Sequence, residues 1–168
     1  MFSRSMGERK VIKFMADHFW RRITPEMEGQ AKDLGFTLDE IVTLASIVEK
    51  EGGKKDEKPM VAAVFHNRLK RRMRLQSDPT VIYDIEDFDG NLKKRHLEEK
   101  TPYNTYQIRG LPPGPICNPG LDAIVAALYP APVDYLYFVS KNNGTHHFSL
   151  NLKSHNKAVI TYQIKRRK

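Results

Sequence analysis

The chain has 168 residues, of which 40% are hydrophobic and 29% are charged, so it is long enough to form a domain with its own hydrophobic core. It carries 28 Lys and Arg against 20 Asp and Glu, a formal net charge of +8, and one cysteine, which excludes an internal disulfide and a cysteine-based zinc site. The longest nearly apolar run, residues 41–48, is far shorter than the roughly 20 residues that a membrane-spanning helix needs.

Basic residues cluster at residues 70–74 and at residues 165–168. Clusters of this kind favour polyanionic partners such as nucleic acid, anionic lipid or an acidic cell-wall polymer. They are also common on surfaces that contact only water, so the charge by itself selects no partner. The first residues contain no apolar stretch, and no secretory signal is predicted there.

Residues 1–35 are predicted to form a peripheral helical segment. Apolar residues between positions 11 and 20 recur at helical spacing, which indicates an amphipathic helix. Thr24 and Pro25 then interrupt the chain, and Pro25 can start a second short helix that ends at Gly35. Residues 36–168 are expected to form the main domain.

The strongest helix signals of the chain lie just after residue 36. A Thr-Leu-Asp-Glu capping box precedes an apolar run, and a Gly-Gly pair follows it, so a helix is predicted over residues 38–51. A further helix is predicted to begin at Pro59 and to carry apolar residues at helical spacing as far as Leu69.

Residues 73–120 are predicted to be mostly irregular. The pair Asp78-Pro79 disfavours a continuous helix, because the residue before a proline avoids the helical conformation. Three prolines make residues 110–115 a rigid, extended loop. Asn118 is expected to cap the next helix, with Pro119 in its first turn.

The last third of the chain predicts a hairpin and a helix. Residues 135–140 and 146–150 have strand composition and are joined by an Asn-Asn-Gly turn, and an amphipathic helix is predicted over about residues 153–164. The fold class that follows is α+β, with several helices and a small antiparallel sheet.

Glu51 is the candidate for acid–base chemistry. The apolar face of the predicted helix is formed by Ile41, Leu44, Ile47 and Val48. Glu51 lies close to that face at 100° per residue, whereas Glu49 lies further round the helix. Including Val42 and Ala45 moves the face toward Glu49, so the spacing favours Glu51 and leaves Glu49 as an alternative. Desolvation beside an apolar face and the negative end of the helix dipole both raise the pKa of a carboxyl, and a carboxylic acid that is protonated near neutral pH can donate a proton. The alternative is a solvent-facing glutamate in a lysine-rich turn.

Polar and aromatic side chains in two later segments are candidates for ligand binding. The segment Tyr103-Asn104-Thr105-Tyr106 suits a sugar, single-stranded nucleic acid or a turn with core tyrosines. Gln76, Ser77 and Asp78 concentrate hydrogen-bonding groups, and Asp78 is either a second catalytic carboxylate or a turn cap. Arg68 either pairs with a carboxylate or faces solvent. No metal-ligand, nucleotide-binding or nucleophile-elbow motif is present.

Three ordered motifs carry a family resemblance: LASIVEKE at residues 44–51, VFHNRL at 64–69 and MRLQSDPTVIY at 73–83. Later segments agree with them, namely YNTY at 103–106, GLPPGPI at 110–116, NPG at 118–120, YLYFV at 135–139, HF at 147–148 and HN at 155–156. Together they closely resemble the endolytic murein transglycosylase family, also called YceG-like, over about residues 38–160.

The resemblance implies that residues 36–168 are a catalytic domain with a lytic-transglycosylase-like active-site helix. It implies cleavage of the β-1,4 bond between N-acetylmuramic acid and N-acetylglucosamine, which leaves 1,6-anhydromuramic ends and terminates nascent glycan strands. The catalytic glutamate of the family is the second one of its Ile-Val-Glu-Lys-Glu motif, which is Glu51 in this sequence. Two positions depart from the family pattern: Gly52 replaces a hydroxyl residue and Ser77 replaces a threonine.

Composition and resemblance together assign substrate binding to Asn67, Arg68, Gln76, Ser77, Asp78, Tyr83, Tyr103, Asn104, Thr105, Tyr106, Asn118 and His147. No metal and no cofactor is expected. The implied partners are peptidoglycan glycan strands and peptidoglycan synthases of the penicillin-binding type, and no nucleic acid is expected. The implied location is the bacterial cell envelope, at the outer face of the cytoplasmic membrane, although a membrane anchor of the family kind is not visible in this sequence.

Two other functions remain open. A hydrolytic muramidase would use Glu51 together with Asp78 and would need both carboxyls. A non-catalytic module that binds glycan or nucleic acid would rely on the basic clusters. For the extended loop at residues 110–115 we expect a position in the wall of the glycan groove, against the alternative of a rigid connector.

Overall fold

The computed structural model describes residues 7–164, so the basic residues 165–168 lie outside the described part. The chain divides into two compact units, residues 1–37 and residues 38–168. Of the first unit, residues 7–37 are described; of the second, residues 38–164. No helix within residues 7–164 combines the length and the apolar character that crossing a membrane requires.

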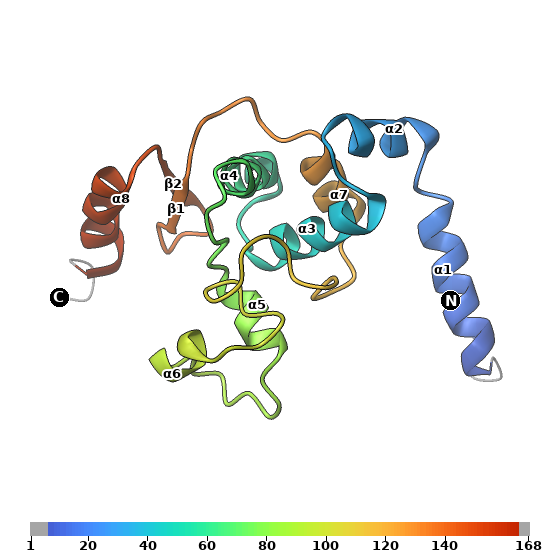
Figure 1. Cartoon of the computed structure of the whole chain (residues 1–168), viewed down its shortest axis with the longest axis horizontal. Coiled ribbons are helices and arrows are strands. Elements are labelled where there is room, and N and C mark those ends of the chain that lie inside the picture. The colour runs from blue at the N-terminus through green and yellow to red at the C-terminus, as the bar shows by residue number, and fades with distance from the viewer. Residues whose placement is uncertain (1–6, 165–168) are drawn as a thin grey trace. The chain divides into compact units, whose positions relative to one another are not determined.

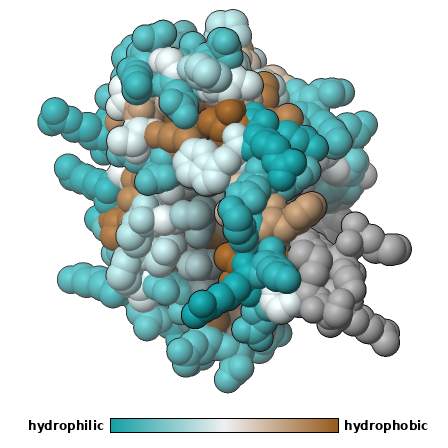
Figure 2. Space-filling view, turned by 90° about the vertical axis from the view of Figure 1, so that its right-hand side faces the viewer, coloured by the Kyte–Doolittle hydropathy of each residue, from teal (hydrophilic) through white to brown (hydrophobic). Residues whose placement is uncertain are grey.

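The first unit consists of helix α1 (Glu8–Trp20) and helix α2 (Pro25–Asp33) (Figure 1). The Thr24 side chain caps α2 by accepting a hydrogen bond from the Met27 amide, and Pro25 occupies the first turn, where no donor is needed. Helix α1 is amphipathic in sequence but buries none of its residues. Ile12 and Trp20 are more than half exposed, and Figure 2 shows a face of the molecule on which brown apolar side chains reach the surface among hydrophilic ones.

Three helices form the core of the second unit: α3 (Leu38–Lys50), α4 (Lys58–Lys70) and α7 (Leu121–Leu128). They pack against one another, with the short 3₁₀ turn η1 (Lys55–Glu57) leading into α4 (Figure 1). The side chains of α3 and α4 that face this core are fully excluded from water, and they include Ile41, Leu44, Ile47, Val48, Val61, Val64 and Phe65. The helices predicted at residues 38–51 and from Pro59 onward are thereby confirmed.

A buried cation ties the three core helices together. The Lys58 side chain is 8% exposed, and its Nζ lies 2.8 Å from a carboxylate oxygen of Glu49 and 3.0 Å from one of Asp122. These two interactions raise the pKa of Lys58 against the opposing effect of burial, so the lysine stays charged. Glu49 therefore links α3 to α4 and α7 through Lys58. Glu51 is the glutamate of this turn that takes no part in this ion pair.

Helix α7 begins later than predicted. Its first residue is Leu121 and its N-cap is Gly120, which provides no side-chain cap; Asn118 is exposed and lies outside the helix. The prediction that Asn118 caps this helix is therefore wrong. Because α7 packs closely on α3 and α4, its small residues Ala123 and Ala127 are buried, while Leu121 and Val125 stay partly exposed.

The segment between α4 and α7 contains two short helices that the sequence did not predict, α5 (Asp78–Tyr83) and α6 (Lys94–Glu98). The Asp78-Pro79 pair begins α5 instead of preventing a helix, because a proline in the first turn removes no hydrogen bond. Most of the remaining residues from 71 to 120 are turns and coil, as predicted.

A two-stranded antiparallel sheet pairs β1 (Tyr137–Ser140) with β2 (His146–Ser149), with Tyr137 opposite Ser149. Both strands are shorter than predicted. The sheet lies between α4, whose Phe65 ring meets the Phe138 ring edge-on at 5.9 Å, and helix α8 (Leu152–Val159). Helix α8 continues as a π-helical turn, η2 (Ile160–Ile164). The predicted α+β class is confirmed.

Candidate active site

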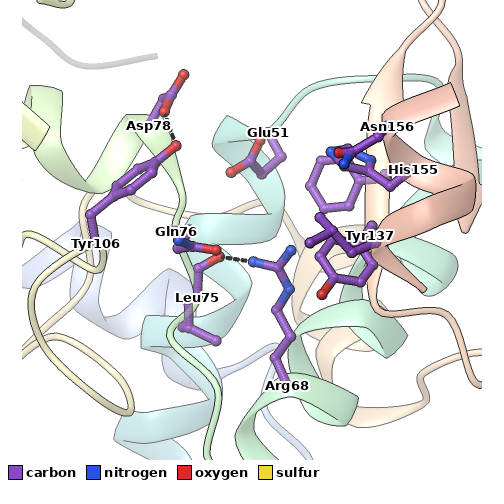
Figure 3. A pocket seen from close by; sticks show the side chains of 11 residues that line it. Glu51, Arg68, Leu75, Gln76, Asp78, Tyr106, Tyr137, His155 and Asn156 are labelled. Atoms are coloured by element: carbon purple, nitrogen blue, oxygen red, sulfur yellow. Dashed lines mark hydrogen bonds between the residues drawn. The ribbon is translucent and has the colours of Figure 1, made fainter. Parts of the chain in front are cut away.

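An open pocket of about 340 Å³ lies between the end of α3, the start of α5, β1 and α8 (Figure 3). Polar groups converge on it from segments that are far apart in the sequence. Its lining residues are Glu51, Arg68, Leu75, Gln76, Asp78, Tyr106, Tyr137, Phe138, Leu152, His155 and Asn156.

Glu51 lies at the top of this pocket as drawn in Figure 3, one residue beyond the end of α3. Its amide still donates a helical hydrogen bond to the carbonyl of Ile47, at 3.0 Å, so the backbone of the last turn is fixed. Its carboxylate oxygen Oε1 accepts a hydrogen bond from the Ser77 hydroxyl. The side chain is therefore oriented by one donor while it faces an open cavity.

Burial raises the pKa of Glu51 to about 7, and it is the largest effect on this group. The negative charge of Asp78 raises the pKa further, while the Ser77 hydrogen bond and the positive charge of Arg68 lower it. At neutral pH the carboxyl is therefore present in both protonation states. A group with this property can donate a proton in one step and accept one in the next.

Ser77 is held in place by a small buried network. Its amide donates to Thr105 Oγ1 at 3.0 Å, and Thr105 Oγ1 in turn lies 2.8 Å from Thr80 Oγ1. The preceding residue, Gln76, has a φ of +50°, in the left-handed region that costs a non-glycine residue free energy. This turn lets Gln76 line the pocket while the next residue, Ser77, reaches the catalytic candidate Glu51.

The turn that follows Glu51 is also fixed. Gly53 has a φ of +88°, and a Cβ at this position would lie 2.9 Å from Cε1 of His146. The His146 ring is held there by Glu57, whose carboxylate accepts from its backbone amide at 3.1 Å and lies 3.0 Å from its Nδ1. Glu57 thereby attaches the 3₁₀ turn η1 to strand β2, and the His146 ring leaves room only for a glycine at position 53.

Arg68 connects the two sides of the pocket. Arg68 is 8% exposed, and its Nε donates to the carbonyl of Leu136 at 2.7 Å. Its Nη1 donates to the carbonyl of Leu75, also at 2.7 Å (Figure 3). The guanidinium also lies over the Tyr137 ring, 5.1 Å from its centroid. The sequence left open whether Arg68 pairs with a carboxylate or faces solvent; the structure shows it buried and bonded to carbonyls, with its charge acting on Glu51 through space.

Asp78 and Tyr106 form a pair on the side of the pocket opposite α8 (Figure 3). The Tyr106 hydroxyl donates to Asp78 Oδ1 at 2.6 Å. Burial, and after it the Asp78 carboxylate, raises the pKa of Tyr106, so the phenol stays protonated and keeps its hydrogen bond to Asp78. The Asp78 carboxylate thus has an ordered position beside Glu51.

The structure brings together a subset of the residues that the sequence assigned to substrate binding. Arg68, Gln76, Asp78 and Tyr106 line the pocket with Glu51. Ser77 and Thr105 are buried just behind it and act on Glu51 through the network described above.

The other assigned residues lie outside the pocket lining. Asn104 is fully buried, and its amide donates to the carbonyls of His96, Leu97 and Glu99, so it shapes its own loop instead of contacting a ligand. Asn67 donates to the carbonyls of Val133 and Tyr135.

The remaining aromatic and imidazole candidates make contacts of their own. The rings of Tyr83 and Tyr103 pack together at 4.7 Å, and the His147 ring packs on that of Tyr162 at 5.7 Å. None of the residues 110–115 lines the pocket, so the expectation that this loop walls the groove is not met. The loop is anchored instead at its end, where the Ile116 amide donates to Ser46 Oγ.

Sequence reasoning missed the wall of the pocket that strand β1 and helix α8 provide. Its members are Tyr137, Phe138, Leu152, His155 and Asn156. A signal was present, because positions 152, 155 and 156 have the i, i+3, i+4 spacing of one helix face. Within residues 7–164, no three His, Cys, Asp or Glu side chains come close enough to hold a metal ion.

Comparison with known proteins identifies the family of this chain. The model of the YceG-like family matches residues 1–161, and the chain belongs to this family. Over 135 residues it is 44% identical to an endolytic murein transglycosylase of Bacillus subtilis (strain 168), covering 80% of this chain and 38% of that protein. Over 167 residues it is 36% identical to an endolytic murein transglycosylase of Streptococcus pneumoniae (strain D39), covering 94% of this chain and 30% of that protein.

Among solved structures, a YceG-like protein from Listeria monocytogenes is similar with a TM-score of 0.83 and 36% identity. The match covers 94% of this chain and 50% of that one. The chain thus spans about a third of the length of the curated relatives and half of the solved one.

Proposed function

We propose that this chain carries the catalytic site of an endolytic lytic transglycosylase that acts on peptidoglycan. The observation that carries the proposal is the carboxyl of Glu51, held in an open polar pocket with a pKa of about 7. Membership of the YceG-like family and the names of the relatives from Bacillus subtilis and Streptococcus pneumoniae support it.

In the first step, protonated Glu51 gives its proton to the glycosidic oxygen between N-acetylmuramic acid and N-acetylglucosamine. The bond from that oxygen to C1 of the muramic residue breaks, and positive charge develops at C1 as in other glycosidic cleavages. The carboxylates of Glu51 and Asp78 are the negative charges at this pocket that can stabilise the developing cation.

In the second step, the ionised Glu51 removes the proton from the C6 hydroxyl of the muramic residue. The C6 oxygen attacks C1 of the same sugar and closes the 1,6-anhydro ring. Because the nucleophile belongs to the substrate, no water enters the product and no second carboxylate is needed to activate one. The Ser77 hydroxyl, which donates to Glu51, stabilises the ionised form between the two steps.

The product distinguishes this reaction from hydrolysis. Digestion of purified glycan strands in oxygen-18 water is expected to give anhydromuramic ends without label, which borohydride leaves unchanged. A hydrolytic muramidase that uses Glu51 and Asp78 would give labelled, reducible muramic ends. Reducible, labelled ends as the first product, together with a folded but inactive Asp78→Asn variant, would replace the proposal with that hydrolase. A chain that binds strands and forms neither kind of end would be a binding module.

We also propose where the reaction takes place. The substrate is part of the bacterial cell wall, so the expected location is the cell envelope, at the outer face of the cytoplasmic membrane, and peptidoglycan synthases of the penicillin-binding type are the expected neighbours. Cross-linking of the full-length protein in cells, followed by identification of the captured proteins, tests this placement. Capture of cytoplasmic proteins alone would contradict it.

A further inference from the structure

Helix α8 presents three different kinds of group to the pocket from one face. Leu152, His155 and Asn156 are spaced i, i+3 and i+4, and all three line the pocket. Figure 3 shows His155 and Asn156 on the side opposite the Asp78–Tyr106 pair. Leu152 is apolar and 53% exposed, although it sits at the mouth of a polar cavity. The reaction proposed above uses none of these side chains.

The His155 ring has a fixed orientation. It stacks on the Tyr137 ring, with centroids 5.2 Å apart and planes inclined by 26°, and Tyr137 is itself held under the Arg68 guanidinium. Its Nδ1 is buried and has no hydrogen-bond partner among the described residues. Nε2 also has no partner there, but it is not among the buried atoms, so it is the ring nitrogen that a ligand can reach.

The burial of Nδ1 determines which of the two ring nitrogens carries the proton. A buried N–H without an acceptor costs more than a buried lone pair without a donor, so Nδ1 is the unprotonated nitrogen. Burial, and after it the electrostatic effects of Arg68 and His147, lower the pKa of His155, which favours the neutral ring. The single ring proton therefore lies on Nε2, and His155 offers the pocket one hydrogen-bond donor.

Asn156 adds the complementary group. Its side chain is exposed at the pocket and has no hydrogen-bond partner among the described residues, so its amide oxygen can accept a hydrogen bond and its amide nitrogen can donate one. One helix face thus combines a fixed donor, an acceptor and an apolar group.

We propose that Leu152, His155 and Asn156 form a binding surface for a secondary amide that bears a methyl group, such as the acetamido substituent of an amino sugar. The amide carbonyl accepts from His155 Nε2, the amide N–H donates to Asn156 Oδ1, and the methyl group packs on Leu152. This surface rests on the proposed function for its substrate class. Two parts of a peptidoglycan strand have this chemistry, the acetamido group and the lactyl amide that begins the peptide.

The test measures binding in the full chain with Glu51→Gln, so that no ligand is cleaved during titration. Chitotetraose and cellotetraose are the matched neutral probes, because they differ in the acetamido or hydroxyl group at C2. We expect chitotetraose to bind at least tenfold more tightly. His155→Phe, which keeps a ring stacked on Tyr137, and Asn156→Leu should each weaken chitotetraose binding about tenfold, the effect of one neutral hydrogen bond, and leave cellotetraose unchanged.

Ser154→Ala is the control on the same helix, because the Ser154 hydroxyl donates to the carbonyl of Asn151 and does not line the pocket. It should leave both affinities unchanged. Muramyl dipeptide, which carries the lactyl amide, identifies the source of the amide. If His155→Phe and Asn156→Leu weaken only this probe, the surface binds the lactyl amide. If the two substitutions weaken the binding of neither chitotetraose nor muramyl dipeptide, the surface does not exist. The same conclusion follows if chitotetraose and cellotetraose bind equally and muramyl dipeptide binding is unaffected by the substitutions.

Failure of this inference can be separated from failure of the proposed function. Anhydro ends formed by the wild-type chain, with an unchanged KM in the His155→Phe and Asn156→Leu variants, would reject the α8 surface and keep the reaction. A chitotetraose affinity that depends on these two residues, in a wild-type chain that forms no anhydro ends, would keep the surface and reject the reaction. Thermal unfolding of each variant verifies that it is folded.

Discussion

The two walls of the pocket differ in how their polar groups are held. On the side of α3 and α5, the network of Ser77, Thr80 and Thr105 is fully hydrogen-bonded, and the Ser77 hydroxyl orients Glu51. On the side of α8, His155 and Asn156 have side-chain polar atoms without partners among the described residues. Proton transfer needs a group whose position is fixed before the reaction, whereas recognition needs groups that are left for the ligand.

The packing behind each wall follows the same division. Helix α3 is part of the buried core with α4 and α7, whereas α8 packs on a sheet of two strands (Figure 1). Arg68 spans the two, because it bonds the carbonyls of Leu75 on one side and Leu136 on the other. We therefore expect the wall formed by α3 and α5, the first wall, to determine kcat. The wall formed by α8, the second wall, is expected to determine KM.

The largest effect is expected for Glu51→Gln, which should lower kcat by at least about a thousandfold because an amide cannot donate the proton. The Ser77 hydroxyl can still donate to the amide oxygen, so the variant should fold. Anhydromuropeptide formation, followed by mass spectrometry, measures the change. Asp39→Asn is the matched control, an exposed carboxyl on the same helix, and should retain full activity. Glu49→Gln is unsuitable as a control because Glu49 pairs with the buried Lys58.

The same substitution should raise stability at alkaline pH. The folded-state pKa of about 7 exceeds the ordinary value of 4.5, so the folded chain binds more protons than the unfolded one between these values, and wild-type stability falls as pH rises through this window. Glutamine does not ionise. Denaturant unfolding should give Glu51→Gln an advantage of about 3 kcal/mol at pH 8 and none at pH 4. An equal difference at both pH values would show that the carboxyl is not desolvated.

Glu51 was predictable from the sequence because helical periodicity places it beside an apolar stripe, and the turn glycines mark where the helix ends. The α8 wall was not assigned, because His155 and Asn156 acquire their role only when the hairpin brings α8 against the pocket. The burial of Asn104 was not predicted for a related reason: an exposed amide and a buried one that bonds the carbonyls of His96, Leu97 and Glu99 have the same local sequence. Asp78-Pro79 was ambiguous, since the same pair can interrupt a helix or begin one.

Substitutions at two adjacent glycines test how firmly the turn that follows Glu51 is held. Gly52 and Gly53 both have positive φ, but a Cβ at Gly52 would meet nothing within 4 Å, whereas one at Gly53 would meet His146 at 2.9 Å. Gly52→Ala should cost about 1 kcal/mol for the left-handed conformation, and Gly53→Ala about 2 to 3 kcal/mol because the His146 contact must also shift. Chemical denaturation measures both costs, and equal values would show that the His146 contact is loose.

The smallest effects concern the pH at which activity is lost, and they probe the first wall through two neighbours of Glu51. Because Glu51 must be protonated to donate, kcat/KM should fall as pH rises through about 7. Ser77→Ala removes a hydrogen bond that lowers the pKa of Glu51, so this fall should move to higher pH. Asp78→Asn removes a negative charge that raises the pKa of Glu51, so the fall in kcat/KM should move to lower pH. The asparagine oxygen can still accept the hydrogen bond from Tyr106.

Each shift should be less than about one pH unit, because burial remains the main cause of the raised pKa. Asn156→Leu is the control from the second wall: it should change KM and leave the position of the fall unchanged, since Asn156 does not act on the pKa of Glu51. Shifts of the same sign for Ser77→Ala and Asp78→Asn would mean that a group other than Glu51 donates the proton. If Asn156→Leu shifted the fall as much as Ser77→Ala and Asp78→Asn do, the assignment of kcat to the first wall and KM to the second would be wrong.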